Sequence, residues 1–231
     1  MQRITIIISA NSEWHSIKGL FPGAVLKKIP FGEYFSLLFK SLPVTFFQGG
    51  WGKISAAATT QYAIDHFQPD LLVNLGTCGG FEGRIAAGAL ILVEKTIVYD
   101  IVEQMSDPVE AIEFYSTPID LSWLPDHPAI TSKKGLLVSA DRDIVIQEIP
   151  ALVEKFGARA ADWESGAIAW VAAKNQTRLL ILRGITDLVG SNGGEAYGRI
   201  DLFHERTEVM MAELVRWFGL ILELMNQNQS S

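Results

Sequence analysis

Short runs rich in valine, isoleucine and leucine constrain the fold of this chain more than any other feature. The runs cover residues 3–10, 43–50, 70–76, 89–100, 134–141 and 178–187. Most of them lack polar alternation, which is typical of strands in a sheet that is covered on both faces. Between them, residues 52–67 and 161–175 have the length and alanine content of helices, and residues 203–227 have the pattern of an amphipathic helix. This alternation predicts a single α/β domain that spans residues 1–231.

The composition excludes some classes of binding partner and indicates the cellular compartment. With 48% hydrophobic and 19% charged residues, a chain of 231 residues can bury a large core without disulfides or a structural metal. The net charge of −7 and the scattered basic residues argue against a nucleic-acid surface. No run approaches the roughly 20 apolar residues of a membrane span, and the apolar start suits a first strand better than a signal peptide. The single cysteine, Cys78, fits a reducing compartment, so we expect a cytoplasmic protein.

Several conspicuous features have structural explanations. Residues 103–128, with several prolines and few periodic apolar residues, predict an irregular excursion of the kind that forms functional loops or interfaces. The four histidines lack metal-ligand spacing, so no metal site is expected. Trp51 and Trp170 are expected in the core, and Cys78 is expected to be a packing residue because no base stands near it in the sequence.

A glycine-rich segment at residues 72–83, LVNLGTCGGFEG, follows a predicted strand directly. Ligands of open α/β sheets bind at strand ends, and Gly76, Gly79 and Gly80 allow backbone N–H groups to approach a ligand closely. A tight turn explains these glycines equally well. The segment does not fit a dinucleotide loop or a phosphate loop, and neither does GGWGKIS at residues 49–55, where Ile54 replaces the required serine or threonine.

Three carboxylates stand at the ends of predicted strands or helices, where they could act in catalysis or bind a ligand. Asp187 ends the run LILRGITD and precedes the glycine-rich GSNGGEAYG, so it is a candidate general acid or base beneath a lid, or the cap of a turn. Asp162 and Glu164 flank Trp163 just before an alanine-rich helix pattern. Such a pair suits the hydroxyls of a sugar, and a carboxylate at this position equally suits the cap of that helix. The spacing alone leaves both interpretations open.

The motifs NLGTCGG, SAD, DWESGAIA and RGITD occur in an order and at separations that resemble the nucleoside phosphorylase/hydrolase superfamily. The nearest resemblance is to its 5′-methylthioadenosine/S-adenosylhomocysteine nucleosidase branch, with the motifs NTG-S/T-x-GG, V-E-M-E-x-x-A-x-A and R-x-I-S-D. GGWGKISAA likewise resembles the branch's G-I-G-K-x-x-A-A. The resemblance covers most of the chain and implies a three-layer α/β/α phosphorylase/hydrolase-like fold with a central mixed sheet. It also implies a homodimer and a reaction without a metal or organic cofactor.

The resemblance assigns roles to the candidate residues. It implies that Glu164 binds the ribose 2′- and 3′-hydroxyls, that Trp163 lies against the sugar, and that Asp187 protonates or hydrogen-bonds to the purine N7. An adenine anion is a poor leaving group and the sugar becomes oxocarbenium-like, so an acid at N7 and a negative charge near the sugar both lower the barrier. The other residues expected to contact the substrate are Thr77, Cys78, Gly79, Asp143, Ile144, Asp162, Thr186 and Phe203. Tyr197 and Phe203 are candidates to cover the 5′ substituent, or they simply pack.

Departures from the branch concern the nucleophile and the base. Asn74 stands where phosphorylases of the superfamily carry a phosphate-binding arginine, so water is the expected nucleophile. The branch's water-activating glutamate falls at Trp14. Glu13, one position earlier, is either the catalytic replacement or a solvated residue at a helix start. Arg142 and Asp143 replace the phenylalanine that stacks on adenine.

The sequence therefore predicts a purine-nucleoside N-ribohydrolase for a 5′-modified adenosine such as 5′-methylthioadenosine or S-adenosylhomocysteine. One alternative is a phosphorylase, if Arg84 or Arg183 reaches the nucleophile site. The others are a non-catalytic nucleoside-binding protein and a nucleosidase for another modified nucleoside such as futalosine. The expected partners are a small-molecule nucleoside and a second copy of the chain, with no nucleic acid and no membrane.

Overall fold

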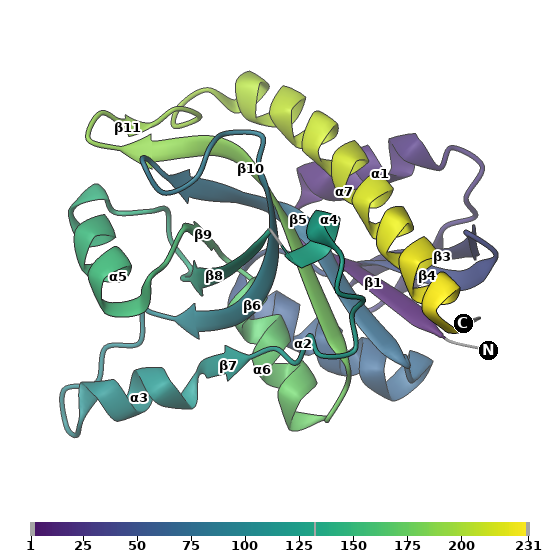
Figure 1. The fold of residues 1–231 in the computed structure, drawn as a ribbon, viewed down its shortest axis with the longest axis horizontal. Helices are drawn as coiled ribbons and strands as arrows, with labels where there is room; N and C mark the ends of the chain where they lie inside the picture. Colours follow the sequence, from purple (N-terminus) through teal and green to yellow (C-terminus); the bar gives the residue numbers. More distant parts are fainter. Residues whose placement is uncertain (1–2, 132, 230–231) are drawn as a thin grey trace.

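The computed structural model describes residues 3–131 and 133–229, and the strands in these ranges form one sheet (Figure 1). Its order is β11-β10-β6-β8-β9-β5-β1-β4-β3-β2, with β7 paired to β6. The strands are β1 (Ile4–Ile8), β2 (Lys27–Ile29), β3 (Gly32–Phe39), β4 (Leu42–Gln48), β5 (Leu71–Phe81), β6 (Leu90–Val98), β7 (Ser116–Pro118), β8 (Lys134–Ser139), β9 (Ala160–Asp162), β10 (Leu179–Gly190) and β11 (Gly193–Gly194). β1 is parallel to β4 and β5, whereas β6 is antiparallel to β10. The expected mixed sheet is confirmed.

Part of this sheet closes on itself. β10 pairs with both β5 and β6, β6 pairs with β8, β8 pairs with β9, and β9 returns to β5. These strands therefore form a small closed ring, while β1, β4, β3 and β2 extend from β5 as an open sheet. The short β9 completes the ring, ends at Asp162 and is followed two residues later by Glu164.

Helices cover both faces of the sheet (Figure 1). They are α1 (Asn11–Leu20), α2 (Gly52–Phe67), α3 (Pro108–Phe114), α4 (Pro128–Thr131), α5 (Ile149–Phe156), α6 (Ser165–Lys174) and α7 (Ile200–Gln229), and η1 (Ile146–Glu148) is a 3₁₀ turn. α1 packs with α7 on one face, and α2 packs with α6 on the other. The expected three layers are confirmed. Within residues 3–131 and 133–229, no helix combines the length and the apolar character needed to cross a membrane.

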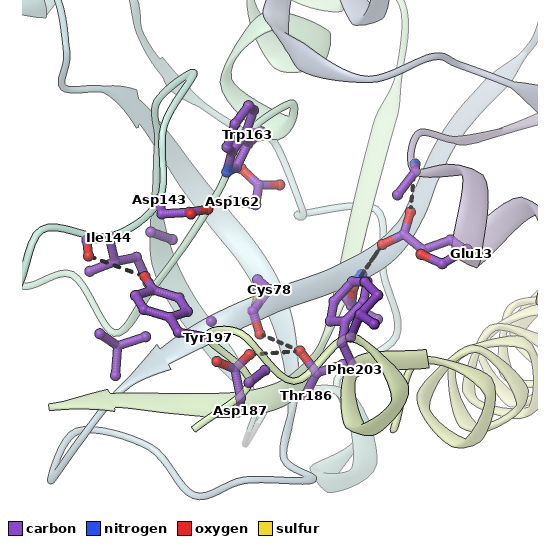
Figure 2. Close-up of a pocket in the computed structure, with 18 of the residues that line it drawn as sticks. Glu13, Cys78, Asp143, Ile144, Asp162, Trp163, Thr186, Asp187, Tyr197 and Phe203 are labelled. Atoms are coloured by element: carbon purple, nitrogen blue, oxygen red, sulfur yellow. Dashed lines mark hydrogen bonds between the residues drawn. The ribbon is translucent and has the colours of Figure 1, made fainter. Parts of the chain in front are cut away.

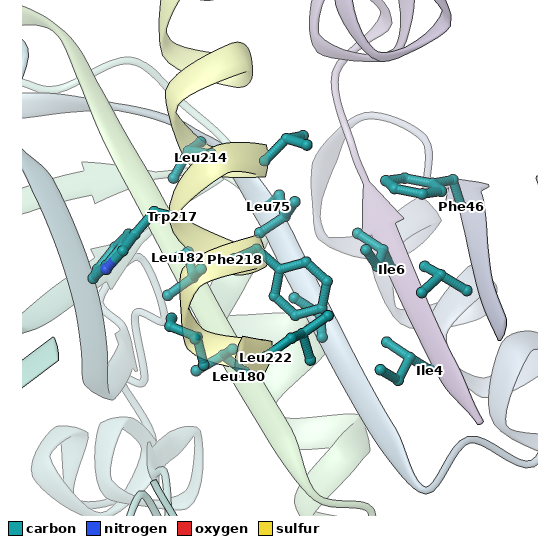
Figure 3. Packing of buried hydrophobic residues seen from close by; sticks show 14 of the residues in the cluster. Ile4, Ile6, Phe46, Leu75, Leu180, Leu182, Leu214, Trp217, Phe218 and Leu222 are labelled. Carbon is teal, nitrogen blue, oxygen red and sulfur yellow. The ribbon is translucent and has the colours of Figure 1, made fainter. Parts of the chain in front are cut away.

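The two faces of the sheet contribute to separate hydrophobic clusters. Ile6 of β1 packs in the cluster beneath α7 with Phe218 (Figure 3), whereas Ile7 packs in the opposite cluster with Ala56 of α2 and Ile168 of α6. Successive side chains of a strand point to opposite faces, so a strand that is buried on both faces is apolar at every position. This burial explains why the apolar runs in the sequence lack polar alternation.

Several predicted boundaries differ from the structure. The strand expected to end at Asp187 continues to Gly190, and the helix expected from residue 161 begins at Ser165, after β9. Residues 103–128, expected to be irregular, contain α3 and β7, and the final helix begins at Ile200 rather than at residue 203. Strands of two or three residues escape prediction because they are too short to show a periodic pattern.

Candidate active site

A cavity of about 710 Å³ opens where β5 and β10 end (Figure 2). Its wall also includes the start of α1, the loop after β8, the junction of β9 and α6, and the segment that leads into α7. Ligands of α/β sheets bind in such crevices at strand ends. Every residue assigned to the site from the sequence lines this one cavity, namely Glu13, Thr77, Cys78, Gly79, Asp143, Ile144, Asp162, Trp163, Glu164, Thr186, Asp187 and Phe203.

Glu13 reaches the cavity from the first turn of α1, and its side chain is only 4% exposed. One of its oxygens, Oε1, accepts hydrogen bonds from Thr77 N (2.5 Å) and Thr77 Oγ1 (2.9 Å), and Oε2 accepts one from Ala10 N (3.1 Å). Burial raises the pKa of Glu13, and the nearby Arg183 together with these hydrogen bonds opposes the shift. The alternative that Glu13 is a solvated residue at a helix start is therefore wrong.

Arg183 lies beneath the cavity and is 1% exposed. Its Nε donates to Asp162 Oδ2 at 2.8 Å, and its Nη2 donates to Asn74 Oδ1 at 2.5 Å. A Cβ atom on Gly76 would lie 2.7 Å from Arg183 Nη1 and 3.0 Å from Glu13 Oε1, so only glycine leaves room for both groups. The guanidinium is thus held by protein groups. From the sequence, Arg183 was a candidate only for binding phosphate in the alternative phosphorylase, although an arginine inside an apolar run signals a buried ion pair.

Asp162 faces inward rather than into open solvent. Besides Arg183, its carboxylate accepts hydrogen bonds from Ser139 Oγ (2.6 Å), from Ser165 N (3.2 Å) and from the Ser165 hydroxyl. These donors satisfy the hydrogen-bonding capacity of a carboxylate that is buried. Asp162 therefore contacts the start of α6, as the capping alternative predicted, and it also anchors the buried Arg183, which the sequence did not indicate.

Glu164 is a buried carboxyl group whose pKa is strongly raised. Its Oε1 accepts a hydrogen bond from Gly52 N at 3.0 Å, and the side chain is otherwise buried in the cavity wall. Burial, followed by repulsion from Asp162 and Glu13, raises the pKa of Glu164 to about 8. Glu13, Asp162 and Glu164 lie near a single buried guanidinium, Arg183, so this part of the cavity holds more carboxyl groups than cations.

Two tryptophans form the wall beside Glu164. The rings of Trp163 and Trp51 stack with their centroids 5.1 Å apart. Trp51, which was expected in the core, is 67% exposed, so that prediction is wrong. The residue immediately before α2 stands at the rim of the cavity, where hydrophobicity alone does not decide burial. Trp170 is partly buried on α6, and its Nε1 donates to the Phe114 carbonyl at 3.1 Å.

A bulge in β10 turns Asp187 toward the cavity. Ile185 pairs with Cys78 and Asp187 pairs with Gly79, so Thr186 is an extra residue in the ladder. The Thr186 hydroxyl donates to Asp187 Oδ1 at 3.0 Å. Burial raises the pKa of Asp187, against the effect of this hydrogen bond. A buried carboxyl group that retains its proton is suited to act as a general acid.

The side of the cavity nearest Asp187 is built by the loop after β8 and by the segment before α7. Tyr197 O–H donates to the Ile144 carbonyl at 3.1 Å, which joins these two segments (Figure 2). The guanidinium of Arg142, the replacement for the branch's phenylalanine, pairs with Glu148 at 2.6 Å and lies over the Tyr99 ring. Arg142 is thus held by the protein, and Tyr197 is the aromatic residue on this side.

Cys78 and Gly79 form the floor of the cavity. Burial raises the pKa of the Cys78 thiol well above its usual value, so the thiol stays protonated and packs, as expected. A Cβ atom on Gly79 would lie 2.8 Å from Ile144 Cδ1, so glycine is required by this close approach. No cluster of three or more His, Cys, Asp or Glu residues in the described ranges is arranged to hold a metal.

The sequence matches a known family and several curated proteins. The model of the phosphorylase superfamily matches residues 6–218. The chain is 28% identical to a 5′-methylthioadenosine/S-adenosylhomocysteine nucleosidase of Buchnera aphidicola, over 96% of this chain and 97% of the relative. It is 27% identical to the enzyme of that name from Halalkalibacterium halodurans, over 93% and 96%.

Solved structures share the fold. The 5′-methylthioadenosine nucleosidase of Arabidopsis thaliana in apo form superposes with a TM-score of 0.80 at 21% identity, covering 98% of this chain and 96% of that one. The Neisseria meningitidis 5′-methylthioadenosine/S-adenosylhomocysteine nucleosidase in complex with methylthio-immucillin-A has a TM-score of 0.76 at 18% identity, covering 96% and 99%.

Proposed function

The chain belongs to the phosphorylase superfamily, and we propose that it is an N-ribohydrolase that cleaves the glycosidic bond of a 5′-modified adenosine. The substrates we assign are 5′-methylthioadenosine or S-adenosylhomocysteine, and the products are adenine and the free sugar. The names of the relatives, and the analogue bound in the Neisseria meningitidis structure, support this substrate class.

The excess of buried carboxylates is the observation that carries the proposal. Asp162 pairs with Arg183, the one buried guanidinium near these three carboxyl groups in the described residues, and burial, followed by the proximity of Asp162 and Glu13, raises the pKa of Glu164. A sugar that gains positive charge in the transition state supplies the cation that such a site lacks. The site therefore binds the oxocarbenium-like transition state more tightly than the neutral nucleoside, which is the requirement for catalysis.

Asp187 acts on the base and Glu164 acts on the sugar at the two ends of the glycosidic bond. Asp187, whose pKa is raised by burial, donates a proton to N7 as the base departs. Glu164 binds the ribose hydroxyls, and its carboxylate stabilises the charge that develops on the sugar. Trp163 lies against the sugar, and Tyr197 and Ile144 border the space for the base. General acid assistance typically contributes about 10²–10⁴-fold to the rate.

Water is the nucleophile that suits the charges beside the sugar. Glu13 is a buried acceptor next to Thr77, and its raised pKa favours taking a proton from water. A phosphate dianion would meet this carboxylate, whereas Arg183 is already committed to Asp162 and Asn74. Arg84, the other candidate ligand for phosphate, is exposed and does not line the cavity. These observations favour hydrolysis over phosphorolysis.

The assembly and the compartment form part of the same proposal. We assign a homodimer, because Met105 and Phe114 present apolar side chains to solvent in the segment of residues 103–128, which was expected to form loops or an interface. We assign the cytoplasm, which suits a single buried thiol. The net charge of −7 fits a small-molecule substrate rather than a nucleic acid.

A substrate panel tests the proposal. Purified protein is incubated with 5′-methylthioadenosine, S-adenosylhomocysteine, adenosine and futalosine, and the released base is measured by chromatography. We expect adenine from the first two substrates, and a much lower rate on their 2′-deoxy analogues because Glu164 loses a hydroxyl partner. Tight binding without release of a base would contradict the enzymatic proposal and support a nucleoside-binding protein instead.

A further inference from the structure

Arg206 and Glu195 form an ion pair near Asp187 to which the reaction described above gives no role. Arg206 Nη1 donates to Glu195 Oε2 at 2.7 Å, and the exposed fractions of the two side chains are 33% and 45%. Glu195 lies between β11 and α7, and Arg206 lies on α7. Neither side chain lines the cavity. An ion pair exposed to this degree adds little to stability, so stability alone does not account for its contacts with β10.

Each member of the pair holds one of the two peptide groups that flank Asp187. Arg206 Nη1 donates to the Thr186 carbonyl at 2.9 Å, and this carbonyl belongs to the peptide group before Asp187. Glu195 Oε2 accepts from the Leu188 N–H at 3.3 Å, and this N–H belongs to the peptide group after Asp187. The Glu195 N–H also donates to the Leu188 carbonyl at 3.1 Å. The backbone of the acid is therefore held from both sides.

The bulge in β10 explains why the acid depends on these contacts. Thr186 is the extra residue of the bulge, where the ladder with β5 is locally disrupted. On the other edge of β10, β6 pairs with the strand before the bulge and β11 pairs with it after the bulge. Residues 186–188 lie between these two pairings. The direction of the Asp187 side chain therefore depends on the ion pair as well as on the sheet.

The segment that carries Glu195 also reaches the carboxyl group itself. Burial raises the pKa of Asp187, whereas hydrogen bonds from Thr186 and from the Ala196 N–H lower it. Ala196 directly follows Glu195, so a displacement of Glu195 would move this N–H away from the carboxyl group. The negative charge of Glu195 raises the pKa of Asp187, and the positive charge of Arg206 lowers it. The pair thus influences both the geometry and the charge around the acid.

We propose that Arg206 and Glu195 are positioning residues, which hold the backbone on either side of Asp187 and so direct its carboxyl group toward the base. This inference rests on the proposed function, because it adds two residues to the same reaction. A catalytic group that is misplaced loses rate even when the substrate still binds. Loss of the pair should therefore lower kcat, while the dissociation constant of the nucleoside, measured by calorimetry, stays nearly unchanged.

The test compares Arg206→Met with Arg216→Met, a matched control on the same helix. Arg216 donates to Glu213 Oε1 at 2.7 Å and to the Ala212 carbonyl at 3.3 Å, so it too binds a carboxylate and a backbone carbonyl. Both of these partners lie on α7, and Arg216 does not line the cavity. We expect Arg206→Met to lower kcat on 5′-methylthioadenosine about tenfold, and Arg216→Met to change it less than about twofold.

Three further measurements separate positioning from a general loss of structure. The substrate 4-nitrophenyl 5-methylthio-β-ribofuranoside releases nitrophenolate without a proton, so Arg206→Met should slow this release less than about twofold. In the Asp187→Asn background, Arg206→Met should cause no further loss, because the acid that it positions is already absent. Glu195→Gln keeps an oxygen that can accept from the Leu188 N–H, so it should retain most of the kcat that Glu195→Ala loses.

The pKa of Asp187 in the unliganded protein tests the pair without turnover, and NMR of isotope-labelled aspartate measures it. The titratable groups near this carboxyl include Glu195 and Arg206, Tyr197 from the same segment, and Cys78 from β5. Arg206→Met removes a positive charge and should raise the pKa of Asp187, whereas the control variant should leave it unchanged.

Each other outcome overturns a distinct statement. Equal losses of rate on both substrates, or a further loss in the Asp187→Asn background, would show that Arg206 supports the structure and does not position the acid. An unchanged pKa of Asp187 in Arg206→Met would show that the pair does not act on this carboxyl group. If the wild type releases no adenine, the proposed function fails, and the pKa of Asp187 still decides whether Arg206 acts on it.

Discussion

Replacing Asp187 with asparagine isolates the acid that we assign to the departure of the base. Asparagine has the same shape, its Oδ1 can still accept the hydrogen bond that Thr186 Oγ1 donates at 3.0 Å, and its amide can still donate a hydrogen bond to N7. The variant therefore keeps the geometry and loses only the transferable proton. We expect nucleoside binding to change by no more than a few-fold while kcat falls steeply.

The expected magnitude follows from the surroundings of Asp187. The carboxyl is buried, so bulk water has little access to serve as a replacement acid. General acid catalysis is typically worth about 10²–10⁴-fold, and a buried acid places the loss near the middle of that range, about 10³-fold or roughly 4 kcal/mol. Because burial raises the pKa of Asp187, kcat of the wild type should fall as the pH rises through that raised value, and this limb should vanish in the variant.

The assay follows release of adenine from 5′-methylthioadenosine and of 4-nitrophenolate from 4-nitrophenyl 5-methylthio-β-ribofuranoside. The nitrophenolate leaves without a proton, so Asp187→Asn should reduce its release less than about tenfold. Calorimetry measures the dissociation constant of the nucleoside. A near-normal kcat on 5′-methylthioadenosine, or equal losses on both substrates, would refute the assignment of Asp187 as the acid.

Three further predictions concern the other polar groups of the cavity. Glu164→Gln should abolish most hydrolysis and yet raise Tm near pH 9 while leaving it unchanged near pH 5, as calorimetric melting would show. The sign follows from a pKa raised to about 8, since the stability from the protonated Glu164 is present at low pH and is lost as the pH rises through that value. Glu13→Gln should lower kcat by about 10²-fold or more with an unchanged dissociation constant, since the amide cannot activate water, and an unchanged kcat would remove Glu13 from the mechanism. Tyr197→Phe removes the hydrogen bond to the Ile144 carbonyl and should raise KM about fivefold with little change in kcat, whereas an unchanged KM would separate this contact from substrate binding.

Most of the fold was predictable because both faces of the sheet are buried. The helix α2 was predicted at its observed bounds, since an alanine-rich stretch between glycine and a strand leaves few alternatives. Two of the three residues of β9, Ala161 and Asp162, were predicted to be helical, because the pairing of this strand depends on β5 and β8, which are distant in the sequence. Local patterns do not contain such long-range pairing.

Site residues that directly follow a strand were predictable from the sequence. The orientation and burial of a side chain were not predictable where they depend on tertiary contacts. Residues 186 and 187 were found because they follow an apolar run, but the bulge that turns Asp187 inward depends on pairing with β5. The burial of Glu13 depends on the Thr77 and Ala10 N–H groups that satisfy its carboxylate. The exposure of Trp51 depends on its place at the rim, which its hydrophobicity does not indicate.

Hydrolysis and phosphorolysis are distinguished by the sugar product that forms from 5′-methylthioadenosine. Purified protein is incubated with 5′-methylthioadenosine with and without inorganic phosphate, and both products are identified by chromatography. We expect adenine and free methylthioribose at a rate that is independent of phosphate. Methylthioribose 1-phosphate that forms only when phosphate is added would contradict this expectation, because a dianion would then be bound beside Glu13 and Glu164.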